Sequence, residues 1–288
     1  MHKTLGPGAI GIRNLPLPEA IALARETGFD SVTFDLREAA RLVDERGADA
    51  LRSLFVNAGV RPGPWSVPVA WRGEDAGEAD LRRLPELATL ARELGSTRAT
   101  TGVMPGSDAH PYDENMAWHV ERLGPVADVL AAEGCRLGIE FIGPKTFRAP
   151  FKHPFVYTLR GALDLAGAIG TGNVGVLLDA WHLYTSGGDV ADLAAVAADD
   201  VVFVHVNDAP PGIPVAEQLD SVRALPLETG VIEIVPFLRA LRDLGYDGPV
   251  MPEPFSQRLE ELAARHPLAA AQEAGRAMDD LWRAAGLA

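Results

Sequence analysis

Residues 173–182 read NVGVLLDAWH, and residues 200–208 read DVVFVHVND. In each stretch an apolar run of strand length ends in polar residues, which is typical of a strand that is buried on both faces. Such strands occur in parallel sheets, where a helix crosses back between one strand and the next. The two stretches therefore predict consecutive βα units.

The same alternation of short apolar runs and longer amphipathic patterns continues along the chain in both directions. It predicts eight strands, at residues 8–12, 31–34, 63–67, 98–102, 136–140, 174–179, 201–206 and 249–253. Several helical patterns between them end at the glycine expected just past a helix, namely Gly28, Gly59, Gly95, Gly134 and Gly245. Eight units in series, without a Ser- or Gly-rich linker, predict one closed (β/α)8 barrel of the TIM type over residues 1–288, with a last outer helix at about 259–285.

The alternative α/β architecture is an open, doubly wound sheet. The turn after the first predicted strand reads GIRNLPLPEA over residues 11–20, and it lacks the Gly-x-Gly-x-x-Gly pattern that cradles a dinucleotide in such sheets. The length of 288 residues and the 47% hydrophobic content are enough for one large core of the barrel type. A single α/β barrel is therefore the favoured fold class.

The overall charge argues against several classes of partner. With 26 Lys and Arg residues against 40 Asp and Glu residues, the formal net charge is -14, which repels the phosphate backbone of a nucleic acid. No apolar run approaches the roughly 18 residues of a membrane span. The single Cys135 rules out an intrachain disulfide and fits a reducing compartment. We expect a cytoplasmic protein that binds a small molecule rather than nucleic acid or membrane; whether it forms a homo-oligomer is left open.

Four residues of metal-ligand type lie at the ends of the last four predicted strands, where a parallel barrel forms its active site. They are Glu140, Asp179, His205 and Glu253, one in each βα unit. Any one of these carboxylates alone is better explained by a helix cap or a surface ion pair. Three carboxylates at one barrel mouth, however, repel each other unless a cation lies between them. The set therefore predicts one divalent cation, Mn²⁺ in the first place, with Mg²⁺, Co²⁺ or Zn²⁺ as alternatives.

The segments around these residues resemble a known family. They are IEF at 139–141, LLDAWH at 177–182, VHVND at 204–208 and MPEPF at 251–255. Together they are similar to motifs of the xylose isomerase-like barrel superfamily, in its sugar phosphate isomerase/epimerase branch, which includes ketose 3-epimerases and inosose dehydratase. The resemblance covers nearly the whole chain. It implies that Glu140, Asp179, His205 and Glu253 bind the metal, and that Glu140 and Glu253 also form the acid/base pair.

The resemblance also implies three residues around the substrate. His182 matches the family's substrate-binding histidine after the metal aspartate, and a helix cap is its alternative. Arg223 resembles the family's arginine before a loop that usually reads Pro-Gly-x-Gly, and a surface salt bridge is its alternative. Here that loop reads LPLETG over residues 225–230, with Leu227 and Glu228 in place of the expected glycine-containing turn. Trp181 is expected to offer an aromatic face to a sugar ring at the mouth, where His182 and Arg223 are expected as exposed side chains.

A basic loop follows the fifth predicted strand. GPKTFRAPFKHPF at residues 143–155 contains Lys145, Arg148, Lys152 and His153. These side chains indicate either a site for a phosphate or carboxylate group or charge balance on a solvated loop. Thr146, the sixth residue after Glu140, stands where the free-ketose epimerases resemble each other in having a second glutamate. This difference argues against a simple ketohexose as the substrate.

These residues predict a metal-dependent isomerase or epimerase of a sugar, or of a sugar-like polyol or cyclitol. A cation that coordinates a carbonyl stabilises the enediolate formed when a neighbouring proton is removed, and carboxylates on two sides of the substrate can take and return that proton. A dehydratase of an inosose-like or shikimate-like substrate would begin with the same step and is the first alternative. An endonuclease IV-like phosphodiesterase is disfavoured by the acidic charge and by the absence of histidine from the first three predicted strands. A non-catalytic binding protein has no need for two carboxylates around a metal.

Overall fold

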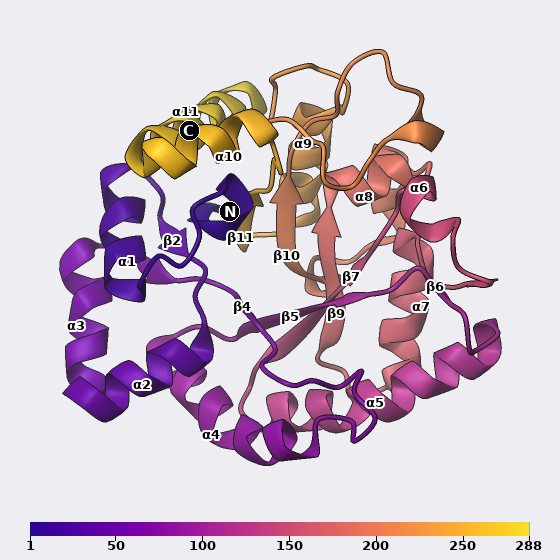
Figure 1. Ribbon diagram of the computed structural model, residues 1–288, viewed down its shortest axis with the longest axis horizontal. Helices are drawn as coiled ribbons and strands as arrows, with labels where there is room; N and C mark the ends of the chain where they lie inside the picture. The colour runs from indigo at the N-terminus through magenta and orange to yellow at the C-terminus, as the bar shows by residue number, and fades with distance from the viewer. Residues whose placement is uncertain (288) are drawn as a thin grey trace.

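The computed structural model describes residues 1–287, in which nine parallel strands form one curled sheet (Figure 1). The strands are β1 (His2–Leu5), β2 (Ser31–Val32), β3 (Arg61–Pro62), β4 (Trp65–Ser66), β5 (Arg98–Val103), β7 (Arg136–Phe141), β9 (Val174–Asp179), β10 (Val201–Val206) and β11 (Pro249–Pro252). Their order in the sheet is β3-β2-β1-β11-β10-β9-β7-β5-β4. Because β3 and β4 are two halves of one extended segment, residues 61–66, the sheet closes on itself there. The predicted (β/α)8 barrel is confirmed.

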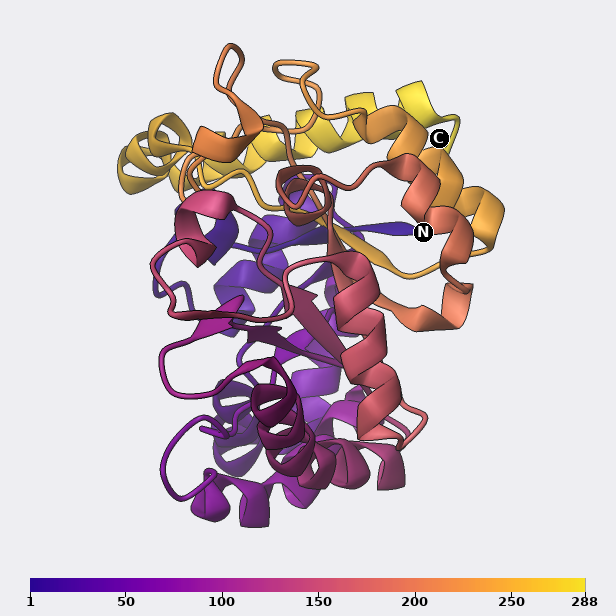
Figure 2. The same ribbon diagram turned by 90° about the vertical axis from the view of Figure 1, so that its right-hand side faces the viewer.

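Helices cover the outside of the barrel, as the two views show (Figures 1 and 2). In the described chain the α-helices are α1 (Leu17–Glu26), α2 (Leu36–Arg46), α3 (Ala48–Ala58), α4 (Glu78–Leu94), α5 (Tyr112–Ala132), α6 (Lys145–Arg148), α7 (Leu159–Ile169), α8 (Ala180–Thr185), α9 (Ile234–Leu244), α10 (Gln257–Arg265) and α11 (Pro267–Ala285). None of these helices has both the length and the apolar character needed to cross a bilayer. The five glycines predicted to follow helices all have positive φ, a conformation that glycine adopts without strain. A small antiparallel pair, β6 (Gly106–Ser107) and β8 (His153–Pro154), joins the loops after β5 and β7.

The structure corrects the predicted first strand. β1 is His2–Leu5, whereas the expected strand at 8–12 begins with a 3-10 helix, η1 (Gly8–Ile10). Pro7 has no amide hydrogen to donate to a sheet, and Gly11 ends the short helix with φ 86°. His2 therefore lies on the first strand, so the sequence argument that the early strands lack histidine is wrong in this detail. His2 stands at the amino end of β1, however, and the candidate ligands stand at carboxyl ends.

Two more predicted boundaries are wrong. Residues 63–67 do not form a single strand, because Gly63 and Pro64 separate the two-residue strands β3 and β4. The C-terminal helix expected at about 259–285 is divided into α10 and α11. Pro267 begins the second helix, and a proline disfavours helical geometry in the residue before it. Both differences lie outside the strands that carry the candidate ligands.

The register of the later strands decides which side chains enter the barrel mouth together. Asp179 on β9 pairs with His205 on β10, and Glu140 on β7 pairs with Leu177 on β9. Side chains alternate between the two faces of a strand, so residues two apart on one strand share a face. The ends of β7, β9, β10 and β11 therefore direct polar side chains toward one point.

Candidate metal centre

Four side chains at strand ends meet at the mouth of the barrel. Glu140 lies near the end of β7, Asp179 ends β9, His205 lies on β10 and Glu253 directly follows β11. One possible ligand atom from each residue lies within 4.8 Å of the others. His205 Nδ1 is 3.4 Å from Glu140 Oε1 and 3.3 Å from Glu253 Oε2. The structure thus brings together all four residues that the sequence assigns to a metal.

Several atoms of this centre are buried without a hydrogen-bond partner in the described chain. They are Glu140 Oε1 and both ring nitrogens of His205. Buried polar atoms are almost always paired, because leaving one unpaired costs roughly 1–3 kcal/mol. A cation coordinated by these atoms would remove that cost. Three carboxylates and one imidazole suit Mn²⁺, Mg²⁺, Co²⁺ or Zn²⁺, so the donor set fits a divalent cation.

The charges and the burial of the centre shift the pKa values of its groups. Burial raises the pKa of Glu140 to about 7. Burial alone would lower the pKa of His205, but the adjacent carboxylates of Glu253 and Glu140 outweigh it and raise that pKa to about 10. Burial likewise opposes ionisation of Asp179, but the Arg223 guanidinium outweighs it and lowers the pKa of Asp179 to about 2. Without a metal ion, a protonated His205 therefore supplies a positive charge between the carboxylates.

Asp179 is held in one orientation by three hydrogen bonds. Its Oδ1 accepts from the Trp181 amide at 2.8 Å, as the N-terminal cap of α8, and from Asn207 Nδ2 at 2.9 Å. Its Oδ2 accepts from Arg223 Nη1 at 2.8 Å. Sequence reasoning missed Asn207, although its place two residues after His205 is a signal that it faces the same centre. A carboxylate fixed in this way is already ordered for binding a cation.

Arg223 is buried, which contradicts the expectation of an exposed side chain at the mouth and also excludes a surface salt bridge. Its side chain is 1% exposed, because the loop after β10 places the guanidinium inside the centre. Nη1 donates to Asp179 Oδ2 and to Glu253 Oε2, both at 2.8 Å, and Nη2 donates to Asp220 Oδ1 at 3.0 Å. Trp181, which was expected at the mouth, is fully buried, with the Arg223 guanidinium 5.2 Å from the centre of its ring. Arg223 thus bridges two candidate ligands, and Trp181 packs against it.

His182 is also buried and points into the centre. Burial lowers its pKa to about 4, so its ring is neutral. Nδ1 accepts a hydrogen bond from the Gly143 amide at 3.2 Å, and Nε2 lies 3.4 Å from Arg223 Nη2, which can only donate. That Nε2 lies 3.7 Å from Asp179 Oδ2 and 3.9 Å from Glu140 Oε1. The alternative of a helix cap is excluded, since Asp179 itself caps α8.

A second buried carboxylate, missed by sequence reasoning, holds the loop that follows Arg223. Asp208 is fully buried and accepts hydrogen bonds from backbone amides at distances of 2.7 to 3.1 Å. The donors are the amides of Ala209, Thr229, Gly230, Val231 and Ile232. In this loop Leu227 has φ 69°, the left-handed conformation that usually requires glycine. The LPLETG loop therefore makes a left-handed turn although it has leucine at that point.

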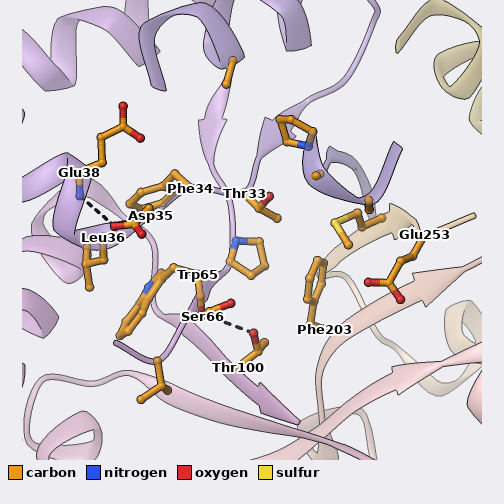
Figure 3. Close-up of a pocket in the computed structure, with 18 of the residues that line it drawn as sticks. Thr33, Phe34, Asp35, Leu36, Glu38, Trp65, Ser66, Thr100, Phe203 and Glu253 are labelled. Atoms are coloured by element: carbon orange, nitrogen blue, oxygen red, sulfur yellow. Dashed lines mark hydrogen bonds between the residues drawn. The ribbon is translucent and has the colours of Figure 1, made fainter. Parts of the chain in front are cut away.

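A pocket of about 1070 Å³ opens beside the centre, and Glu140, His205 and Glu253 form part of its wall. It extends across the barrel mouth to residues after β2 and at the end of β4, where Thr33 and Ser66 line it (Figure 3). Pockets for small ligands span roughly 300–1,000 Å³, so a small molecule fits beside the candidate ligands.

The basic loop after β7 makes no part of this pocket wall. The residues that line the pocket include none of Lys145, Arg148, Lys152 and His153. Thr146 Oγ1 donates a hydrogen bond to the Gln218 carbonyl at 2.6 Å, so this side chain is used to hold the loop after β10. The geometry therefore favours charge balance over anion binding as the role of the basic loop.

Fold and centre together define a class of protein, the parallel α/β barrels that carry a Glu-Asp-His-Glu set at the carboxyl ends of consecutive strands. The sequence model of the xylose isomerase-like TIM barrels matches residues 21–281, so the chain belongs to that family. The family inferred from the strand-end segments is confirmed.

Individual proteins of this kind are similar to the chain along much of its length. A xylose isomerase domain protein from Alicyclobacillus acidocaldarius superimposes with a TM-score of 0.86, at 29% identity, over 99% of both chains. A ketose 3-epimerase of Arthrobacter globiformis is 25% identical over 250 residues, which are 82% of this chain and 77% of that protein. An inosose isomerase of Bacillus velezensis is 26% identical over 155 residues, which are 53% of this chain and 51% of that protein. The chain thus matches about half the length of that inosose isomerase.

Proposed function

We propose that this protein is a divalent-cation-dependent isomerase or epimerase that acts on a sugar, or on a sugar-like polyol or cyclitol. The observation that carries the proposal is a pair of pocket-wall carboxylates, Glu140 and Glu253, on two sides of His205, with closest distances of 3.4 and 3.3 Å to its Nδ1. The similarity to proteins named ketose 3-epimerase and inosose isomerase supports the same type of reaction.

The cation would be held by Glu140, Asp179, His205 and Glu253, and Mn²⁺ is the first candidate because oxygen ligands predominate. When bound there, a divalent cation supplies polarisation of a substrate carbonyl, which acidifies the neighbouring C–H bond. The task that remains for the side chains is to bind the substrate and to move its proton.

Glu140 lines the pocket beside the candidate cation site and is placed to move a proton of a bound ligand. Glu253 lines the same pocket from the end of β11, and Arg223 Nη1 orients it through Oε2. One carboxylate removes a proton from the carbon beside the carbonyl. Return of a proton to the opposite face of that carbon gives an epimer, and return to the neighbouring carbon gives an isomer.

His182 and Arg223 have different tasks in this scheme. His182, which the sequence assigned to the substrate, does not line the pocket; its Nε2 lies 3.7 Å from Asp179 Oδ2 and 3.9 Å from Glu140 Oε1, so its ring supports these two candidate ligands. Arg223 is fully engaged by Asp179, Glu253 and Asp220, so it keeps two ligand carboxylates in place. The ring of Trp181 packs against the Arg223 guanidinium.

Exchange of substrate hydrogen with solvent deuterium tests the proposal. The Mn²⁺-loaded protein is incubated in D₂O with a panel of ketoses and inososes, and NMR locates the exchanged carbon. Glu140→Gln and Glu253→Gln should each lower the exchange rate by about 10²-fold or more, because each removes a proton-transfer group. Glu78→Gln on α4, at a side chain that is 70% exposed, is the matched control.

Two outcomes would count against an isomerase. If the metal-loaded wild-type protein exchanges no hydrogen with any member of the panel, the proposal is overturned. If an unsaturated ketone accumulates, the same proton abstraction leads to loss of water, and the protein is a dehydratase.

A further inference from the structure

A layer of apolar side chains lies deeper in the barrel than the candidate ligands, two residues earlier on the same strands. Leu177, Phe203 and Met251 each precede a ligand by two residues, so their side chains enter the barrel on the same face of the same strands. Ala9 of η1 packs with these three side chains in a cluster of its own, and Phe255 packs against it. All five residues line the pocket, and we call them the apolar floor: Leu177, Phe203 and Met251 lie deeper than the candidate ligands, whereas Ala9 and Phe255 come from the segments that follow β1 and β11.

The hydroxyl groups of the pocket lie on another wall. Thr33, which follows β2, lines it together with Ser66 on β4 and Thr100 on β5, and Figure 3 shows them across the pocket from Phe203 and Glu253. The hydroxyls of Thr33 and Thr100 donate to backbone carbonyls at 3.4 and 3.5 Å, which is long for a hydroxyl hydrogen bond. These groups therefore remain able to bond a ligand. The pocket joins the apolar floor to a side where hydroxyl groups lie among apolar side chains such as Phe34 and Trp65.

We propose that this pocket selects a cyclic polyol over an open-chain one, an inference that rests on the proposed function and narrows its substrate class. A six-membered ring with equatorial hydroxyls exposes C–H bonds on its two faces and oxygens around its edge. Such a ring lies with one face on the apolar floor while its edge meets the hydroxyl wall and the centre. An open-chain polyol has hydroxyls on both sides of its carbon chain, so it buries some of them against the floor without partners.

Two unreactive probes with equal numbers of hydroxyls, scyllo-inositol and D-glucitol, separate the two shapes. Their binding to the Mn²⁺-loaded protein is measured by calorimetric titration. Scyllo-inositol should bind at least about tenfold more tightly, since one buried hydroxyl without a partner is enough for a factor of that size. Equal affinities, tighter binding of D-glucitol, or no binding of scyllo-inositol at tens of millimolar would overturn the inference.

Substitutions in the apolar floor test whether the floor is the cause. Ala9→Ser adds one hydroxyl to the floor with little extra volume, and Ala166→Ser on α7 is its matched control, since Ala9 is 9% and Ala166 is 8% exposed. Met251→Gln is a second floor variant that keeps the length of the side chain. Each floor variant should reduce the preference for the ring by about threefold or more, whereas Ala166→Ser should leave it unchanged. If Ala9→Ser folds and keeps the full preference, the floor does not select the ring.

The deuterium exchange panel keeps this inference apart from the proposed function. Exchange from open-chain ketoses without exchange from inososes would retain the isomerase and overturn the ring preference. Tighter binding of scyllo-inositol without exchange from any substrate would retain the ring preference and overturn the proposed reaction.

Discussion

Binding of a divalent cation at the centre should release protons, because His205 carries a proton that a metal ligand cannot keep. Burial opposes this proton, but the carboxylates of Glu253 and Glu140 outweigh it and raise the pKa of His205 to about 10. Glu140 carries a second proton over part of the range, because burial raises its pKa to about 7. A change of pH therefore alters both the number of protons released and the affinity for the cation.

The two pKa values give the size of the effect. At pH 8 His205 is protonated and Glu140 is mostly ionised, so about one proton leaves for each cation bound. At pH 6 Glu140 is mostly protonated as well, and about two protons leave. The apparent affinity for the cation rises with pH, by about tenfold per unit between pH 7 and 10 and more steeply below pH 7.

Calorimetric titration with Mn²⁺ in two buffers of different ionisation enthalpy counts these protons. His205→Gln should lower the release at pH 8 by about one proton. His119→Gln is the matched control, because burial lowers the pKa of His119 to about 4 and its ring is neutral at this pH. If the wild-type protein releases no protons at pH 8, His205 is neutral in the metal-free protein and the account of the centre is wrong. If His205→Gln releases as many protons as the wild type, the displaced proton belongs to another group.

Three further changes test the residues that support the centre, each by urea unfolding of the metal-free protein. Arg223→Met should lower the free energy of unfolding by about 3–5 kcal/mol, because it leaves buried carboxylates unpaired. The control Arg258→Met removes an exposed ion pair and should lower it by less than about 1 kcal/mol. Equal losses in the two variants would show that the Arg223 contacts do not stabilise the fold. Asp208→Asn should lower the free energy of unfolding by about 1–3 kcal/mol, because the NH₂ group of asparagine would face backbone N–H groups that are also donors. An unchanged unfolding transition would mean that other contacts hold the loop. Leu227→Gly should raise the free energy of unfolding by about 0.5 kcal/mol, because glycine adopts the left-handed conformation without strain. Leu219 does not have positive φ, so the control Leu219→Gly should lower the free energy of unfolding. A loss of stability in both variants would show that the backbone at Leu227 is not strained.

The strands that carry the centre could be predicted closely from the sequence, and the first strand could not. β9 and β10 have the predicted bounds, because their long runs of Val, Leu and Phe end at polar residues. β1 has four residues, HKTL, and contains no apolar run that a local pattern would detect. Its place in the sheet depends on parallel pairing with β2 and β11, which are distant in sequence. Short strands of this kind are defined by their neighbours rather than by their own residues.

The candidate ligands were accessible to sequence reasoning for a similar reason. Each stands at the end of its own strand, so a local pattern and the rule that parallel barrels place their sites at carboxyl ends are sufficient. The burial of Arg223 was not accessible, because it depends on how the loop between β10 and α9 folds back over the centre. That course is set by the many amides that bond to Asp208, and a single acidic residue after a strand gives no sign of such a set.

The burial of Arg223 also explains why the centre suits a divalent cation in particular. The three carboxylates bring three negative charges into a largely buried site, and Arg223 returns one positive charge through its contacts at 2.8 Å with two of them. Asp220, the other carboxylate on this guanidinium, is 27% exposed, and solvent screens its charge. The two negative charges that remain are matched by a divalent cation when both histidines are neutral and Glu140 is ionised. Above the pKa of Glu140, the proton on His205 alone leaves the metal-free site negative, and buried net charge is costly. With Arg223 exposed to solvent, the cation would have faced three unscreened carboxylates. The loop anchored by Asp208 is therefore part of the candidate metal centre, although none of its residues is a candidate ligand.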